Sequence, residues 1–159
     1  MTLTRVFVLG LIALMGFSVG CAKLFGPKAT QAALELRASS TLNPDDSDRP
    51  SPLRLRLYEL KSVSAFNSAD FNSLYQRDKE ELGGNLVAVE EIQVQPGMQK
   101  KFTRSLSPDT KFLGVLAPYR KIEQAGWRAS IEVPPGKTTS LVLDVGSLAV
   151  TLAPPQKKK

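Results

Sequence analysis

The sequence predicts a mainly β domain: a two-sheet β-sandwich of about eight strands with one short helical insertion. Short runs in which apolar and polar residues alternate recur roughly every ten residues after residue 30, separated by Gly, Pro, Asn and Asp. Only one stretch, between residues 66 and 84, has helical spacing of its apolar residues. This combination favours a sandwich over a helix bundle or a doubly wound α/β fold.

The first two strands flank a long polar loop. Residues 34–38 alternate apolar side chains (Leu34, Leu36 and Ala38) with charged ones, which predicts the first strand. The second strand begins at Leu53 and alternates up to Leu57, after which the apolar phase slips to Tyr58. A phase slip inside a strand suggests a β-bulge.

A single helix is expected next, from Phe66 to the glycine pair at residues 83–84. Asn67 is a good N-cap, and Asp70 three residues later completes a pair that resembles a capping box. Phe66 before this cap and Phe71 after it fit a hydrophobic staple. The glycine pair ends the helix in the usual C-terminal manner.

Strand patterns then resume and continue to the end of the domain. They cover residues 87–94, 98–106, 112–117, 127–133, 141–145 and 148–152. The nearly continuous apolar run at 112–117 indicates a central strand buried on both faces or under the helix. Trp127 heads a clean alternation, so its ring is expected between the sheets. Gly146-Ser147 suits a two-residue hairpin turn.

The N-terminus is typical of an exported, lipidated protein. Arg5 precedes an uncharged, mostly apolar stretch from Val6 to Val19, too short for the about 20 residues that span a bilayer. Small residues lead into Cys21, the only cysteine, and this junction resembles the bacterial lipobox. That resemblance implies cleavage before Cys21 and acylation of its thiol and new amine. Ala22, where Asp would retain the protein at the inner membrane, implies the outer membrane.

The chain therefore divides into four expected parts. Residues 1–20 are a lipoprotein signal peptide, 21–30 a lipidated tether, 31–153 the β-sandwich domain and 154–159 a disordered basic tail. An ordinary signal peptide that ends near a free thiol is the alternative interpretation of the first part.

Composition excludes several function classes. With no histidine, the chain has no Ser-His-Asp or Cys-His nucleophile, no histidine-liganded zinc and no histidine general base. Although the net charge is +6, the basic residues are scattered, so a nucleic-acid partner is not expected. The acidic run that begins at Asn43 lacks the glycine and glutamate spacing of an EF-hand, which leaves only a looser ion site open. We therefore expect no enzyme, no catalytic residues, no metal and no cofactor besides the covalent lipid on Cys21.

Eight short motifs, in order over roughly residues 34–150, resemble the TssJ (VasD/Lip) family of type VI secretion outer-membrane lipoproteins. They are Leu42-Asn43-Pro44, Arg49-Pro50-Ser51-Pro52, Arg56-x-Tyr58-x-Leu60, Phe66-x-x-Ala69-Asp70-Phe71-x-x-Leu74-Tyr75, Leu82-Gly83, Pro96-Gly97, Gly114-Val115-Leu116-Ala117-x-Tyr119-Arg120 and Ala125-x-Trp127-Arg128. The resemblance implies a transthyretin-like β-sandwich with an added helical element. It also implies a lipid-anchored structural protein on the periplasmic face of the outer membrane, within a multimeric trans-envelope complex.

The same resemblance implies a partner and a contact site. The partner would be the periplasmic C-terminal region of a TssM-like inner-membrane protein, bound by the loop between the first two strands. That loop consists of Thr41, Leu42, Asn43, Pro44, Asp45, Asp46, Ser47, Asp48, Arg49, Pro50 and Ser51. Two alternatives stay open: a periplasmic lipoprotein that binds a small ligand or ion, and an envelope-assembly lipoprotein with another partner.

Overall fold

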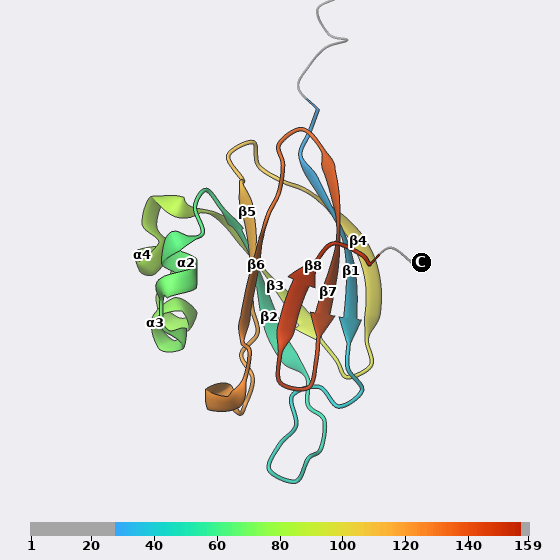
Figure 1. Cartoon of the computed structure of the whole chain (residues 1–159). Helices are drawn as coiled ribbons and strands as arrows, with labels where there is room; N and C mark the ends of the chain where they lie inside the picture. Colours follow the sequence, from blue (N-terminus) through green and yellow to red (C-terminus); the bar gives the residue numbers. More distant parts are fainter. Residues whose placement is uncertain (1–27, 157–159) are drawn as a thin grey trace, which may run out of the picture.

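The computed structural model describes residues 28–156, which fold into two four-stranded sheets packed face to face (Figure 1). The strands are β1 (Gln31–Ala38), β2 (Leu53–Leu60), β3 (Leu86–Val94), β4 (Gln99–Ser105), β5 (Phe112–Leu116), β6 (Arg128–Glu132), β7 (Thr138–Val145) and β8 (Val150–Ala153). The predicted two-sheet sandwich is therefore confirmed. The signal peptide, Cys21, Ala22 and the last three lysines lie outside the described residues.

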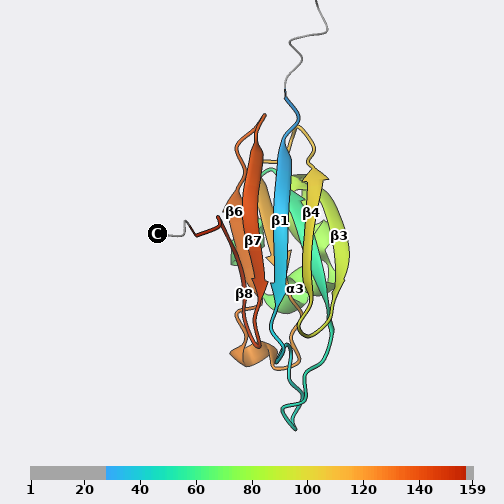
Figure 2. The ribbon, with the colours of Figure 1, turned by 90° about the vertical axis from the view of Figure 1, so that its right-hand side faces the viewer.

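The two sheets have the strand orders β4-β1-β7-β8 and β3-β2-β5-β6. Strands β1 and β7 pair in parallel, and every other named pair is antiparallel. The chain enters β1 at one end of the sandwich, here called the entry end. The β1–β2, β3–β4, β5–β6 and β7–β8 connections lie at the opposite end, here called the loop end (Figures 1 and 2).

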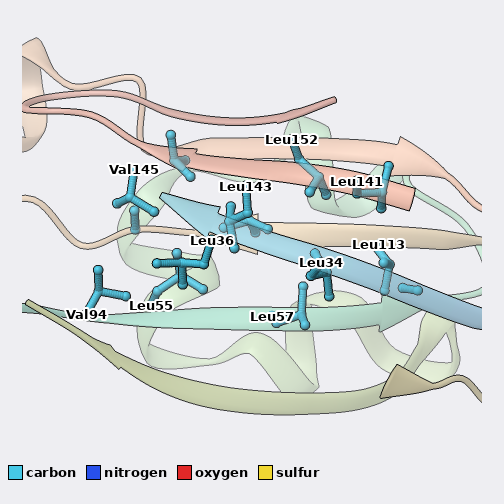
Figure 3. Packing of buried hydrophobic residues seen from close by; sticks show 14 of the residues in the cluster. Leu34, Leu36, Leu55, Leu57, Val94, Leu113, Leu141, Leu143, Val145 and Leu152 are labelled. Carbon is cyan, nitrogen blue, oxygen red and sulfur yellow. The ribbon is translucent and has the colours of Figure 1, made fainter. Parts of the chain in front are cut away.

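The main core lies between the sheets and follows the alternation expected from the sequence. Leu34 and Leu36 of β1 are at most 2% exposed and pack with leucines from the facing sheet, such as Leu55 and Leu113 (Figure 3). Full burial of one such side chain contributes about 1.5–3 kcal/mol. Because the buried residues come from both sheets, this cluster fixes how the two layers stack.

The apolar phase of β2 changes because the strand is buried on both faces. Leu53, Leu55 and Leu57 belong to the core between the sheets, whereas Tyr58 and Leu60 belong to a second cluster on the outer face. A register shift does occur beside this point, between Glu59 and Leu60 in the pairing with β3. The slip in the sequence pattern nevertheless reflects a change of the buried face.

Three short helices cover this outer face, and the prediction of one helix is wrong. They are α2 (Ser64–Ser68), α3 (Phe71–Gln76) and α4 (Asp78–Leu82), followed by the 3₁₀ turn η1 (Gly83–Asn85). Asn67 lies inside α2, while Asp70 caps α3 by accepting a hydrogen bond from Ser73 N at 3.0 Å. Ala69 adopts an extended conformation and separates the two helices. No helix among residues 28–156 is long and apolar enough to cross a bilayer.

Phe66 of α2 fastens the helical segment to β5. A Cβ atom added to Gly114 would lie 2.9 Å from Phe66 Cζ, so only glycine lets this ring approach the sheet. The Phe66 ring also contacts Tyr58, with 5.4 Å between centroids. Arg128 Nη1 donates to the carbonyls of Phe66 and Ala69, at 3.1 and 2.6 Å. The apolar run of β5 is thus buried under the helices, as predicted.

Two local expectations from the sequence are wrong. Trp127 precedes β6 and borders both apolar clusters; its ring meets Phe71 of α3 edge-on, with 5.3 Å between centroids, and is partly exposed rather than buried between the sheets. The two-residue hairpin turn expected at Gly146-Ser147 is also wrong. Val145 pairs with Val150, so the β7–β8 connection spans residues 146–149, and Gly146 N donates to Ala149 O within it.

Candidate functional site

The β1–β2 connection, which contains the predicted contact site Thr41–Ser51, projects beyond the loop end of the sandwich (Figures 1 and 2). Most of its side chains are exposed or partly exposed. Leu42 and Asn43 are the exceptions, at 0% and 3% exposure. These two residues therefore cannot belong to a contact surface, and they hold the loop in place instead.

Asn43 joins three loops that are distant in the sequence. Its Nδ2 donates to Pro52 O at 3.2 Å, and its Oδ1 accepts a hydrogen bond from Arg120 N at 2.8 Å. Its backbone N donates to Ser147 O at 3.0 Å. The residue has a φ of 49°, in the left-handed region that asparagine tolerates better than most residues. Asn43 therefore fixes where the loop leaves the sandwich.

Replacing Asn43 with alanine is expected to destabilise the domain by about 1–3 kcal/mol, because two partly buried backbone groups, Pro52 O and Arg120 N, lose their partner. Urea unfolding followed by tryptophan fluorescence measures this change. The matched control is Asp46→Ala, an exposed position in the same loop, which should stay within about 0.5 kcal/mol of the wild type. Equal stabilities for the two variants would contradict the anchoring role of Asn43.

The tip of the loop is closed by its own hydrogen bonds. Asp45 Oδ1 accepts from the backbone N–H groups of Ser47 and Arg49, at 2.9 and 3.0 Å, and Oδ2 accepts from Arg49 Nε at 2.9 Å. The backbone N–H of Arg49 in particular holds the pKa of the Asp45 carboxyl below its usual value. The tip is therefore preformed and presents Arg49 and Asp48 to solvent, with 78% and 90% of their side chains exposed.

The β5–β6 connection, which contains the 3₁₀ turn η2 (Ile122–Gln124), supports the loop from the side. Lys121 Nζ lies 3.9 Å from Asp48 Oδ1, and the buried Tyr119 hydroxyl donates to Gly146 O at 3.2 Å. Burial raises the pKa of Tyr119. Sequence reasoning did not assign Arg120 or Lys121 to the site, although the Tyr119-Arg120 pair was among the motifs that carry the resemblance.

The resulting surface mixes charges of both signs on an ordered backbone. Its exposed or partly exposed charged side chains are Asp45, Asp46, Asp48, Arg49, Arg120, Lys121 and Glu123. Such charges set orientation and association rate more than affinity. Within residues 28–156, no cluster of three or more metal-ligating side chains is present. The geometry at the loop end suits recognition of another protein.

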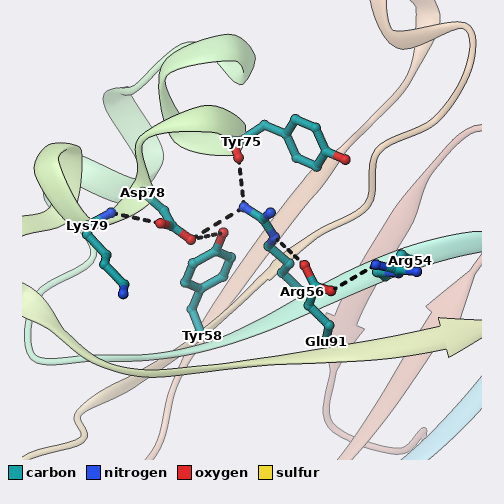
Figure 4. A network of polar contacts seen from close by, with 7 residues as sticks. All are labelled: Arg54, Arg56, Tyr58, Tyr75, Asp78, Lys79 and Glu91. Atoms are coloured by element: carbon teal, nitrogen blue, oxygen red, sulfur yellow. Dashed lines mark hydrogen bonds and ion pairs between the residues drawn. The ribbon is translucent and has the colours of Figure 1, made fainter.

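A polar network elsewhere in the fold has a structural role. Arg56 donates to Tyr75 O at 2.7 Å and to Glu91 Oε1 at 3.1 Å, while Tyr58 donates to Asp78 Oδ2 at 3.2 Å (Figure 4). Burial raises the pKa of Tyr58 to about 12. These bonds tie α3 and α4 to β2 and β3, so the network holds the helical segment in place.

The fold and the loop end together define a β-sandwich interaction domain whose candidate contact surface faces away from the point where the chain enters. The family model for the type VI secretion lipoprotein (VasD, EvfM, TssJ) matches residues 30–148. The chain therefore belongs to the type VI secretion lipoprotein family. Curated protein sequences gave no match.

Solved structures agree with this assignment. The T6SS lipoprotein TssJ1 from Pseudomonas aeruginosa is 35% identical with a TM-score of 0.77, over 82% of this chain and 99% of that chain. A chain from a type VI membrane complex is 28% identical with a TM-score of 0.70, over 80% and 100% of the two chains. A chain from a structure described as the TssM C-terminal domain from EAEC is 25% identical with a TM-score of 0.67, over 79% and 99%.

Proposed function

We propose that this protein is the outer-membrane-anchored lipoprotein of a type VI secretion membrane complex. In this role its loop end docks the periplasmic C-terminal region of a TssM-like inner-membrane protein. The observation that carries the proposal is the position of the two ends of the sandwich. Residues 28–30 lead into β1 at the entry end, and the loop Thr41–Ser51 projects from the loop end (Figure 1). A chain held by lipid on Cys21 would therefore present the loop away from the membrane.

The segment between the proposed anchor and the sandwich has a suitable length. Residues 21–30 can extend to about 33–36 Å at most. This reach leaves the domain close to the membrane while the loop end remains accessible to a partner that crosses the periplasm. Ala22 supports sorting to the outer membrane, in line with the family resemblance.

The loop is well suited to docking because it is ordered before binding. The hydrogen bond that Asn43 donates to Pro52 O fixes the base of the loop, and the one that Asp45 accepts from Arg49 N fixes its tip. Pro44 and Pro50 restrict its backbone further. A preformed loop loses less conformational entropy on binding than a flexible one. Its exposed charges then select the orientation of the partner.

Replacing Asp45–Arg49 with a Gly/Ser linker is expected to weaken binding to the TssM-like periplasmic region at least about tenfold, or about 1.4 kcal/mol. A longer replacement that includes Asn43 would also remove the hydrogen bonds that anchor the loop, so the shorter exchange isolates the contact surface. The melting temperature should change by only a few degrees. Calorimetry with the two purified periplasmic regions measures the affinity.

The matched control exchanges Glu80 and Glu81 of α4 for serine, because these exposed residues lie on the helical segment. This control should bind like the wild type. Unchanged affinity in a folded loop variant would move the interface elsewhere, first to the helical segment 64–82. Loss of binding in the control alone would lead to the same conclusion.

A further inference from the structure

A cleft of about 470 Å³ lies between the start of α3 and η2. Helix α3 lies on the side of the sandwich that carries the helices (Figure 1). The volume of the cleft falls within the range of small binding pockets, about 300–1,000 Å³. Its lining includes Asp70, Phe71, Ile122, Glu123, Trp127 and Arg128. None of them belongs to the loop proposed above as the docking site.

One part of the cleft wall is apolar, and Ser68 and Asn72 add polar groups to the rest of the lining. Phe71 and Trp127 meet edge to face with 5.3 Å between ring centroids, and both rings remain partly exposed. Ile122 of η2 is also partly exposed and contributes to the lining. Partly exposed aromatic residues in a concave site are typical anchor points of protein interfaces. The charged surface at the loop end lacks such an anchor.

The rim of the cleft carries negative charge. The backbone N–H of Ser73 holds the pKa of the Asp70 carboxyl below its usual value, so this group stays ionised in mildly acidic conditions. Glu123 adds a second, exposed carboxylate. The one positive group, Arg128, already donates to two carbonyls of the α2 region and stacks 4.6 Å from the Trp127 ring. Two carboxylates outnumber this one cation, so the lining has a net charge of −1, which suits a basic group.

The cleft is continuous with the loop end. Ile122 and Glu123 directly follow Arg120 and Lys121, whose contacts with Asn43 and Asp48 support the docking loop. One polypeptide that binds the loop could therefore follow η2 into the cleft without crossing unrelated surface.

We infer that this cleft receives an apolar side chain from the partner's docking segment, next to a Lys or Arg that faces Asp70 and Glu123. The inference rests on the proposed function and deepens it: the loop sets orientation, and the cleft supplies most of the affinity. Burial of the apolar side chain against Phe71, Ile122 and Trp127 is the driving contact.

The test measures the affinity of Phe71→Ser and Ile122→Ser for the periplasmic region of the TssM-like protein by calorimetry. Each change removes apolar wall from the cleft and should weaken binding about tenfold or more. Glu123→Lys should weaken binding as well, and added salt should reduce the difference from the wild type. Circular dichroism melts verify that each variant is folded.

Tyr75→Ser is the matched control, because Tyr75 stacks on Phe71 from the same helix, is 37% exposed and lies outside the cleft. It should bind within about twofold of the wild type. If the cleft variants bind normally while the loop exchange weakens binding, this inference is overturned and the proposed function stands. If neither set affects binding, both fail. If Phe71→Ser instead changes self-association in sedimentation experiments, the occupant is a second copy of this chain and the inference is also overturned.

Discussion

Replacing Phe66 with alanine is expected to destabilise the domain by about 3–5 kcal/mol, the usual cost of deleting a buried phenylalanine ring. Phe66 is 0% exposed, and its ring fills the space above Gly114 and beside Tyr58. Because backbone atoms line this space, the surroundings cannot fully close around the smaller side chain. Since domains of this size are stable by only about 5–15 kcal/mol, the loss would be a large fraction of the total.

Urea unfolding followed through Trp127, the only tryptophan, measures this loss. The matched control is Phe71→Ala, which removes the same ring from a partly exposed position on the next helix. The control should cost clearly less, because much of its ring already contacts water. Similar losses for the two variants would contradict the packing of α2 on β5 described above.

The strands could be predicted from the sequence because their signal is local. Leu34 and Leu36 alternate with exposed or half-buried residues within β1 itself, and Leu143 and Val145 flank the exposed Asp144 in β7. The order of the strands could not be predicted in this way. The parallel pairing of β1 with β7 joins segments about a hundred residues apart, and no short pattern in either segment encodes it.

The helical segment was predicted less well because several local signals competed. Asn67 and Asp70 are both good N-caps, and the extended Ala69 between α2 and α3 decides that Asp70 is the one used. The prediction that the Trp127 ring lies between the sheets was wrong for a related reason. Its alternation with the residues of β6 is real, but Trp127 precedes the strand and packs against Phe71, a contact between distant segments.

Composition located the candidate docking loop, since eleven polar and proline-rich residues between two strands exceed the usual 2–5 of a hairpin connection. It could not show which of them face solvent. The burial of Asn43 depends on Arg120, 77 residues away, and on Ser147 in the β7–β8 turn. The contribution of η2 was missed because Ile122 and Glu123 have no distinctive pattern of their own.

Replacing Cys21 with serine is expected to abolish stable membrane attachment. Cys21 is the only cysteine and directly follows the apolar stretch Val6–Val19 and Gly20, so no other thiol could accept the diacylglycerol. Each buried methylene contributes about 0.8 kcal/mol, and stable anchoring needs more than one acyl chain. Removing the thiol removes all of this binding energy at once. Incorporation of radiolabelled fatty acid and membrane fractionation measure the effect.

The control for Cys21→Ser is Ser18→Leu, which introduces the residue usual three positions before a lipobox cysteine and should leave labelling and fractionation intact. The sandwich itself should keep its melting temperature in the Cys21→Ser variant, because Cys21 lies outside its strands, the first of which spans Gln31–Ala38. A loss of attachment with an unchanged melting temperature would therefore report on the lipid anchor and not on folding. If Cys21→Ser still takes up label and fractionates with the outer membrane, the lipobox interpretation is wrong, and the orientation proposed for the loop end loses its basis.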